Sequence, residues 1–198
     1  MCIRDRFTPP PPNKGMPTWL IVLLTAGLGG VFVVGILAVL AIYGVRKYIA
    51  NAKSAEARNS LGQIAKDSAT AVEREKGSTA IVAVGAQSTI MRAFCSSATA
   101  TVPTTVPVAQ KYQSQISDWN AGAGDTGWQC LKFSLEEPQY YMYGYTSSAT
   151  NAASGNFNAV ANGDLNGNGV LSTFSISGLA YSGAVAISPN IQETNPEE

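Results

Sequence analysis

The sequence contains no histidine among its 198 residues, so imidazole is absent as a general base, as the partner of a nucleophile and as a metal ligand. Charge is scarce and balanced, with 13 basic and 13 acidic side chains. A protein without net charge lacks the field that holds nucleic acid phosphates or steers an acidic substrate. We therefore expect no nucleic acid among its partners.

Patterns that carry catalysis are also missing. Serine is plentiful but has no histidine to activate it, and Glu136 and Glu137 form a surface-like pair before Pro138. No glycine-rich loop leads from a strand into a helix, as phosphate binding requires. The sequence predicts a protein that is not an enzyme, has no small-molecule substrate and needs no cofactor, apart from a weak calcium ion considered below.

One long apolar segment dominates what is present. No charged side chain lies between Lys14 and Arg46, whereas about 20 apolar residues suffice to cross a bilayer. The segment is too long for the apolar region of a signal peptide, and no small-residue cleavage site follows it. We expect a transmembrane helix over residues 16–45, preceded by a disordered Pro-rich leader over residues 1–15.

The helix is predicted to continue beyond this span. Residues 46–76 contain no proline and are rich in Ala, Glu, Lys and Arg, which favours an amphipathic helix that extends the first one. Small and apolar residues recur there at three- and four-residue steps, namely Val45, Tyr48, Ile49, Ala52, Leu61, Ile64, Ala65 and Val72. We expect this stripe to lie on a sheet.

Short strand-like runs, divided by Gly, Asn, Asp and Pro, occupy a head domain over residues 77–190. The predicted strands are Trp128–Ser134, Gln139–Thr146, Asn156–Asn162, Ser172–Ser177 and Ala184–Ile187. They indicate an antiparallel meander, followed by a frayed acidic tail over residues 191–198. The predicted fold class is α+β, with a long N-terminal transmembrane and amphipathic helix packed on a C-terminal antiparallel sheet.

Two cysteines follow the apolar span. Cys95 and Cys130 form an even pair in a small domain rich in Ser, Thr, Asn and Gly, which indicates a disulfide and an oxidising compartment. The alternative is two unpaired buried thiols. Basic residues flank the span almost equally, so the cysteines decide the orientation, and we expect the C-terminal domain to lie outside the cytoplasm.

The segment GDLNGNG, residues 163–169, has the spacing of part of a calcium loop. Alternate residues match ligand positions of an EF-hand, namely Asp164, Asn166, Asn168, the backbone of Val170, and Ser172. Ser175 stands where the loop would need a bidentate Glu, so any calcium binding should be weak. The alternative, which the same residues favour, is a tight turn in which Gly167 and Gly169 adopt positive φ.

Tyrosines are concentrated in the run QYYMYGYT, residues 139–146. Alternation along a strand places Tyr141, Tyr143 and Tyr145 on one face and Tyr140 and Met142 on the other. We expect the first face to pack on the helix, where tyrosine adds large apolar area. A binding surface or an aromatic contact between subunits is the alternative.

Two segments carry a family resemblance. The run GILAVLAIYGVRKYIANAKSAEARNSLGQIA, residues 35–65, is similar to the N-terminal helix of type IV pilins and of the pseudopilins of type II secretion. The run GDLNGNGVLSTFSISG, residues 163–178, is similar to a loop and strand near the end of many pilin-like proteins. The resemblance implies a subunit that is anchored in a membrane and joins a filament.

The resemblance also implies a processing site, with one departure. In this family the leader is cut after a Gly, and the new first residue is methylated; Gly15 and Met16 match that site. The family carries Glu at the fifth mature position, where this sequence has Leu20. In pilins that carboxylate pairs with the amino terminus of a neighbouring subunit.

Small residues in the span offer another route to assembly. Gly27, Gly29, Gly30 and Gly35, with neighbouring alanines, let helices approach closely in lipid. The alternative is that glycine is merely common in membrane helices.

These observations lead to two expectations of function. The first is a structural pilin-like subunit of a surface filament or secretion pseudopilus, whose partners are the membrane and, through the N-terminal helix, copies of itself or other pilin-like subunits. The second is a membrane-tethered periplasmic binding or adhesion module that does not polymerise. Both predict a single-pass protein of the bacterial inner membrane with a periplasmic or extracellular C-terminal domain.

Overall fold

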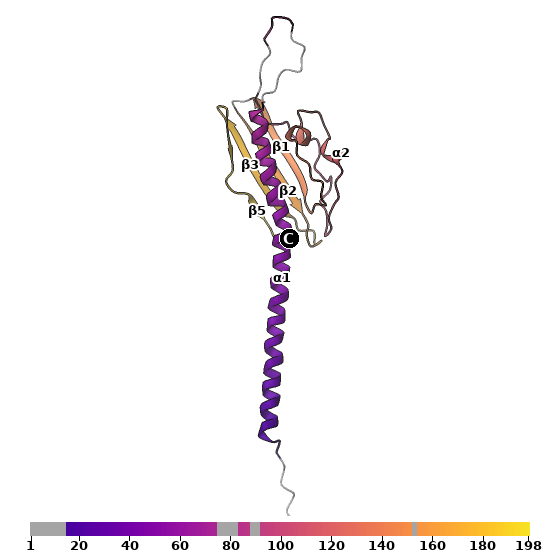
Figure 1. The fold of residues 1–198 in the computed structure, drawn as a ribbon, viewed down its shortest axis with the longest axis vertical. Coiled ribbons are helices and arrows are strands. Elements are labelled where there is room, and N and C mark those ends of the chain that lie inside the picture. Colours follow the sequence, from indigo (N-terminus) through magenta and orange to yellow (C-terminus); the bar gives the residue numbers. More distant parts are fainter. Residues whose placement is uncertain (1–14, 75–82, 88–91, 152–153) are drawn as a thin grey trace, which may run out of the picture. The chain divides into compact units, whose positions relative to one another are not determined.

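The chain forms two compact units, Met1–Arg46 and Lys47–Glu198. The structure is a computed structural model that describes residues 15–74, 83–87, 92–151 and 154–198. Helix α1 (Thr18–Glu73) supplies residues to both units (Figure 1). Most of the predicted leader, and the last two residues of the predicted 46–76 helix, lie outside the described residues.

The first part of α1 is the apolar segment that the sequence predicts. The helix begins just after Pro17, whose fixed φ suits a helix start, and the Pro17 carbonyl accepts a hydrogen bond from the Leu20 amide at 2.9 Å. Its apolar side chains are exposed, Val31 and Phe32 among the most. The helix is long and apolar enough to cross a membrane, as expected.

One five-stranded antiparallel sheet forms the centre of the second unit. Its strands are β1 (Met142–Asn151), β2 (Ser154–Gly163), β3 (Ser172–Tyr181), β4 (Ala184–Ile187) and β5 (Gln192–Thr194). Strands β1 to β4 follow one another as a meander, and β5 pairs with β3 at the end of β3 that β4 leaves open. The predicted α+β class and the antiparallel sheet are confirmed.

The sheet has one buried face, which we call the inner face. The odd-numbered residues 143–147 of β1, the odd-numbered residues of β2 and the even-numbered residues of β3 point to it, among them Tyr143, Phe157 and Phe174, all at most 1% exposed. Tyr141 and Tyr145 are buried there as well, so the prediction that these tyrosines pack in the core is confirmed.

The opposite face, which we call the outer face, is made by the residues in between. It consists of the even-numbered residues 142–148 of β1 and 154–162 of β2, the odd-numbered residues 173–181 of β3, and Ala184, Ala186, Gln192 and Thr194 from β4 and β5. Its residues are exposed or half-buried. The alternation in exposure along β2 and β3 follows the two-residue period of a strand.

The second part of α1 covers the inner face (Figure 1). Leu61, Ile64 and Val72 are buried in the core that the tyrosines share, as the predicted stripe requires. The prediction that the stripe lies on the sheet is wrong for its residues nearest the apolar span, because Tyr48 and Ile49 are exposed. Small residues make up the rest of the buried surface of α1, namely Ser54, Ala57, Ser60, Ala65, Ser68 and Ala71.

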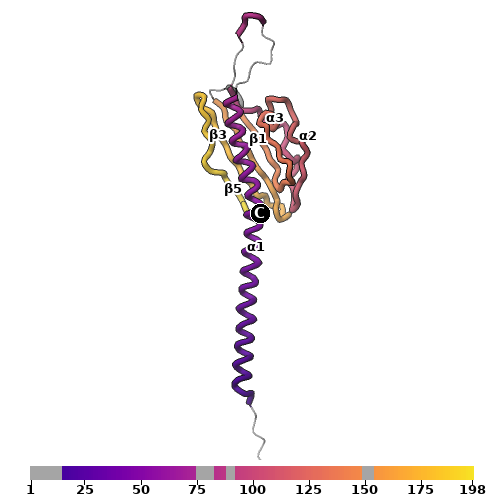
Figure 2. The backbone as a smooth tube through the Cα atoms, in the orientation of Figure 1, coloured from indigo at the N-terminus to yellow at the C-terminus, as the bar shows by residue number. Residues whose placement is uncertain are grey.

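Before the sheet, residues 92–141 follow an irregular path beside β1 (Figure 2). It carries two short helices, α2 (Ile116–Trp119) and α3 (Gly127–Leu131). It reaches β1 through hydrogen bonds such as that from the Val102 amide to the Tyr143 carbonyl, 3.0 Å long.

The strand predicted over Trp128–Ser134 is wrong, because α3 occupies most of it. Trp128 and Leu131 are both buried, and their three-residue spacing suits one helical turn. The helix stops at Lys132, whose φ of 61° is left-handed. Two aromatic partners hold this turn, because the Trp128 ring lies 5.1 Å from Trp119 and 5.8 Å from Phe133.

Two other strands differ from their predicted bounds. Gln139 pairs with Tyr112 instead of β2, so β1 starts later than expected. Strand β3 continues past Ser177 to Tyr181. The glycine that follows Ser177 suggests a strand end, yet a Cβ at Gly178 would lie 2.4 Å from the Phe157 ring, so this glycine serves packing and not a turn.

The predicted frayed tail is wrong over Gln192–Thr194, which forms β5. Glu193 extends toward α1, where its two carboxylate oxygens accept hydrogen bonds from the Arg58 guanidinium at 2.6 and 2.9 Å. A polar strand at the edge of a sheet has no alternation of apolar residues, so the composition of this segment alone predicts a frayed tail.

The predicted disulfide between Cys95 and Cys130 is present, with the two Cα atoms 5.7 Å apart. Cys95 follows the buried Phe94, and Cys130 lies in α3. The bond therefore ties the irregular segment to itself beside the aromatic cluster of Trp119, Trp128 and Phe133.

Candidate functional site

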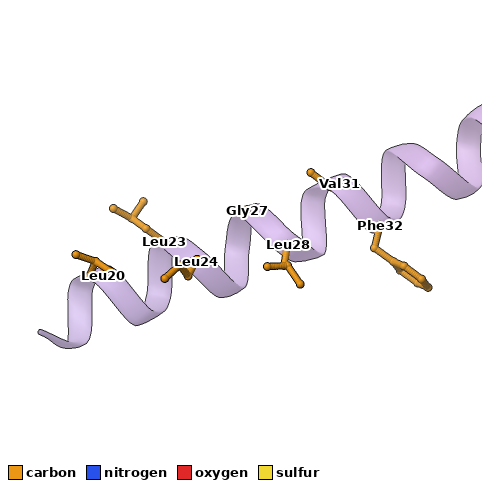
Figure 3. A pocket seen from close by; sticks show the side chains of 7 residues that line it. All are labelled: Leu20, Leu23, Leu24, Gly27, Leu28, Val31 and Phe32. Atoms are coloured by element: carbon orange, nitrogen blue, oxygen red, sulfur yellow. The ribbon is translucent and has the colours of Figure 1, made fainter. Parts of the chain in front are cut away.

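The exposed apolar surface of α1 is the first candidate site. A shallow groove runs along one side of the helix, and Gly27 forms its floor because it has no side chain (Figure 3). Its walls are Leu20, Leu23, Leu24, Leu28, Val31 and Phe32. A groove with apolar walls and a glycine floor fits either a lipid chain or the side of another helix.

The predicted cleavage site lies just before this surface. Gly15, Met16 and Pro17 precede the helix and have no regular secondary structure, and Met16 is 64% exposed. An accessible segment without regular secondary structure is open to a protease. Leu20 follows on the first turn of α1 and belongs to the groove wall.

A carboxylate joins α1 to the sheet, and the sequence analysis did not identify it. The Glu56 Oε1 atom accepts hydrogen bonds from the Tyr140 amide at 2.8 Å and from the Tyr143 hydroxyl at 3.3 Å. Burial raises the pKa of Glu56, and the two hydrogen bonds and the positive charge of Lys111 oppose that shift. Burial also raises the pKa of the Tyr143 hydroxyl, and the negative charge of Glu56 raises it further.

Cations surround the same junction. The Lys53 and Lys111 ammonium groups lie 5.0 and 4.7 Å from the centre of the Tyr140 ring, a cation–π arrangement. The Arg58 guanidinium lies 5.3 Å from the Phe174 ring while it pairs with Glu193, and this pairing holds the pKa of Glu193 below its usual value. These contacts fix the helix on the sheet, and the only hint in the sequence is the polar side of the amphipathic pattern.

A polar hollow of about 350 Å³ lies between α1 and the segment after α3. Asn59, Gln63 and Asp67 form its helix side, and residues 132–135 form the other. The Gln63 amide donates to Asp67 at 2.8 Å, and burial raises the pKa of that carboxyl group. Amide and carboxyl groups of this kind can hold water or a small polar molecule, but their arrangement supplies no nucleophile with an activating base.

In the loop between β2 and β3, the Asp164 carboxylate acts as a cap. It is 3% exposed, and it accepts hydrogen bonds from the amides of Gly167 at 2.6 Å, Asn168 at 3.2 Å and Gly169 at 3.0 Å. Gly167 and Gly169 have φ of 78° and 85°, the left-handed values that the turn alternative requires. The geometry is that of a closed turn held by one carboxylate.

Asn166 and Asn168, two other residues predicted as calcium ligands, also bind backbone amides of the loop. The Asn166 Oδ1 atom accepts from the Asn168 amide at 2.9 Å, and the Asn168 Oδ1 atom accepts from the Val170 amide at 2.7 Å. Ser172 is buried at the start of β3, on the inner face beside Tyr141. Within the described part of the chain, no three His, Cys, Asp or Glu side chains gather as metal ligands.

A second carboxylate does reach the loop. The Asn166 and Asn168 side-chain amides donate to the Glu198 carboxylate, the second at 2.8 Å. For calcium to enter, the three backbone N–H groups that point at Asp164 would have to turn away, because they present hydrogen atoms where a cation would lie. The arrangement as it stands fits a turn better than a calcium site, and calcium binding stays a prediction.

Comparison with known proteins gives no relative: no protein-family model, curated protein or solved structure matches the chain.

Proposed function

We propose that this chain is a pilin-like structural subunit, held in the bacterial inner membrane by the first part of α1, with its second unit on the periplasmic or extracellular side. The observation that supports this most is that one continuous helix, α1, has an exposed apolar part and a part that packs on the sheet. It is apolar and exposed over the predicted span, and from Ser54 onward it packs on the antiparallel sheet of a unit that also contains a disulfide. The sequence resemblance to type IV pilins and pseudopilins points to the same architecture.

The groove around Gly27 suggests how subunits would associate. Between helices in lipid there is no hydrophobic driving force, so association depends on close packing of complementary surfaces. A Cβ placed on Gly27 or on Gly29 would meet no atom within 4 Å, so neither glycine is required by the fold of a single subunit. Only Gly27 lies in the groove. The two glycines are therefore a matched pair for testing assembly.

Gly27→Leu should fill the groove and abolish filaments, whereas Gly29→Leu, the same change on another side of the helix, should leave them intact. Both variants would be expressed in cells that carry a pilus assembly system, and filaments sheared from the surface would be counted by electron microscopy. The proposal is wrong if the wild-type chain stays a membrane-bound monomer in these cells.

Leu20 favours a second candidate, a tethered binding or adhesion module. Without a carboxylate at that position, a subunit cannot make the ion pair with a neighbour's amino terminus. Mass spectrometry of the N-terminus in the presence of a prepilin peptidase distinguishes the two. A chain that starts at methylated Met16 supports the pilin-like subunit. A chain that is not cut between Gly15 and Met16, and so keeps its leader, supports the tethered module. Leu20→Glu should then increase filament yield only if the subunit proposal holds.

A further inference from the structure

The outer face of the sheet carries no charged side chain on any described strand residue that defines it, although the chain has 26 charged residues, 13 of each sign. The nearest strand carboxylate, Glu193, points the other way, to Arg58 on α1. The outer face is instead rich in hydroxyl and amide groups, for example Thr146, Asn158 and Ser177, which are paired across three strands.

Several of these polar side chains are already held in place. The Ser148 hydroxyl donates to the Asn156 side-chain oxygen at 2.9 Å, and the Thr173 hydroxyl donates to the Asn162 side-chain oxygen at 2.9 Å. Side chains fixed in advance lose less rotamer freedom when a ligand binds. Their spacing, about 4.8 Å between strands and about 6.8 Å along a strand, is on the scale of a single sugar ring.

An apolar platform lies at one end of this face. Leu179 is 52% and Tyr181 is 73% exposed, and β4 places Ala186 and Ala184 opposite them. A tyrosine ring with its hydroxyl in water offers a flat apolar surface together with a hydrogen-bonding tip. The apolar carbons on one side of a sugar ring match such a surface.

The chemistry of the face limits what it can bind. A polyanion needs cations and a basic partner needs carboxylates, and this face offers neither. A protein interface of standard size has a central cluster of large apolar or aromatic side chains, whereas here the two large exposed ones, Leu179 and Tyr181, lie at one end, and Met142 and Val160 are half-buried. A neutral polymer rich in hydroxyl groups requires no opposite charge and uses the donors and acceptors that the face presents.

We propose that the outer face of the sheet binds a neutral polysaccharide, with the Asn, Ser and Thr rows hydrogen-bonding the hydroxyl groups and Tyr181 stacking on a sugar ring. The inference does not depend on whether subunits polymerise. If they do, repetition of the face along a filament would raise the avidity for an extended glycan.

The test uses the full chain in lipid nanodiscs, so that no detergent with a sugar head group competes. Microcrystalline cellulose and chitin are the probes, and sedimentation measures the bound fraction. Wild type should bind at least one of them in a manner that high salt does not weaken. Tyr181→Ala and Asn158→Asp should each lower the apparent affinity about tenfold, whereas Tyr181→Trp should retain it.

Matched controls lie outside the sheet. Ile116→Ala removes an apolar side chain that is 64% exposed, and Asn120→Asp introduces the same charge as Asn158→Asp, so both should bind like wild type. Absence of binding to both polymers, or binding that Tyr181→Ala and Asn158→Asp leave unchanged, overturns the proposal. Self-association that Tyr181→Ala abolishes, without polysaccharide binding, would identify the face as an interface between copies and would also overturn it.

Discussion

Asp164 holds the loop between β2 and β3 closed with a single carboxylate. Three backbone amides donate to it, and its side chain is almost fully buried. Hydrogen bonds to a charged acceptor contribute more than neutral ones, and their loss leaves buried donors without a partner. The stability of this loop should therefore depend on the Asp164 carboxylate and not on a bound calcium ion.

Asp164→Ala should lower the free energy of unfolding by about 1.5–3 kcal/mol. Thermal melts of the full chain in calcium and in chelator should show the same loss, because the carboxylate acts on backbone amides. Asp125→Ala, at an exposed position, is the control. A rise in wild-type melting temperature at micromolar calcium that Asp164→Ala removes would show that the loop is a calcium site after all.

Glu56 is a partly buried carboxylate whose negative form is disfavoured. Its pKa lies above the ordinary value of 4.5 because burial outweighs its hydrogen bonds to Tyr140 and Tyr143. The folded protein therefore holds the proton more tightly than the unfolded chain does. The stability that this provides is complete below the unfolded pKa and is lost as pH rises through the folded pKa.

Glu56→Gln should remove this pH dependence and leave the protein as stable as wild type or more stable at neutral pH, by up to about 1 kcal/mol after solvent screening. The amide oxygen still accepts from the Tyr140 amide. Denaturant unfolding from pH 4 to pH 8, roughly the window above the unfolded pKa, measures the effect, with the exposed Glu73→Gln as control. A large loss of stability at neutral pH would mean that the charge itself holds α1 on the sheet.

At the scale of elements, simple patterns of apolar residues identified three elements. The apolar span of α1 could be predicted from its long run without charge, β2 from its alternation of residues, and β4 from its place between turn residues. Elements that depend on contacts with distant residues could not be predicted: α3 depends on the packing of Trp128 on other aromatic rings, and β5 depends on its pairing with β3 and on Arg58. In the same way, the turn of Asp164 could be predicted from local spacing, whereas the contact of Glu198 with it could not.

The pairing of β5 with α1 can be tested through its ion pair. Glu193→Gln should lower the free energy of unfolding by about 0.5–1 kcal/mol, because both side chains remain partly exposed. The loss should shrink at high salt and disappear in acid, since the lowered pKa of Glu193 contributes stability above its unfolded pKa that is lost as pH falls through the folded pKa. Glu197→Gln, which disrupts a more exposed pair with Lys47, is the matched control.

At the scale of the whole molecule, the disulfide stabilises the part of the second unit that has the least regular structure. Cys95 and Cys130 are separated by 35 positions in the sequence and enclose a segment with two short helices and few strand contacts. The pairing could be predicted because only these two cysteines follow the span. The path of the chain between them could not, because it depends on which aromatic side chains meet in the core.

Replacing Cys95 and Cys130 together by Ser should cost about 3–4 kcal/mol of stability, the chain-entropy value for a loop of this length. Thermal melts of the full chain measure the loss, and Cys2→Ser, in the predicted leader, should have no effect. Thiol labelling of protein from the cell envelope under denaturing, non-reducing conditions should leave Cys95 and Cys130 unlabelled. Two reactive thiols there would contradict both the bond and the proposed compartment.

The distance in sequence between Arg58 and Glu193 means that their ion pair can form only late in synthesis. The partners are 135 positions apart, and a ribosome adds about 5–20 residues per second, so roughly 7–27 s pass between the emergence of the first and of the second. Throughout that interval the buried side of α1 has no complete sheet to cover it. If the apolar segment enters the bilayer as proposed, the rest of α1 must wait in this incomplete state during synthesis, and we expect a chaperone to bind its uncovered side.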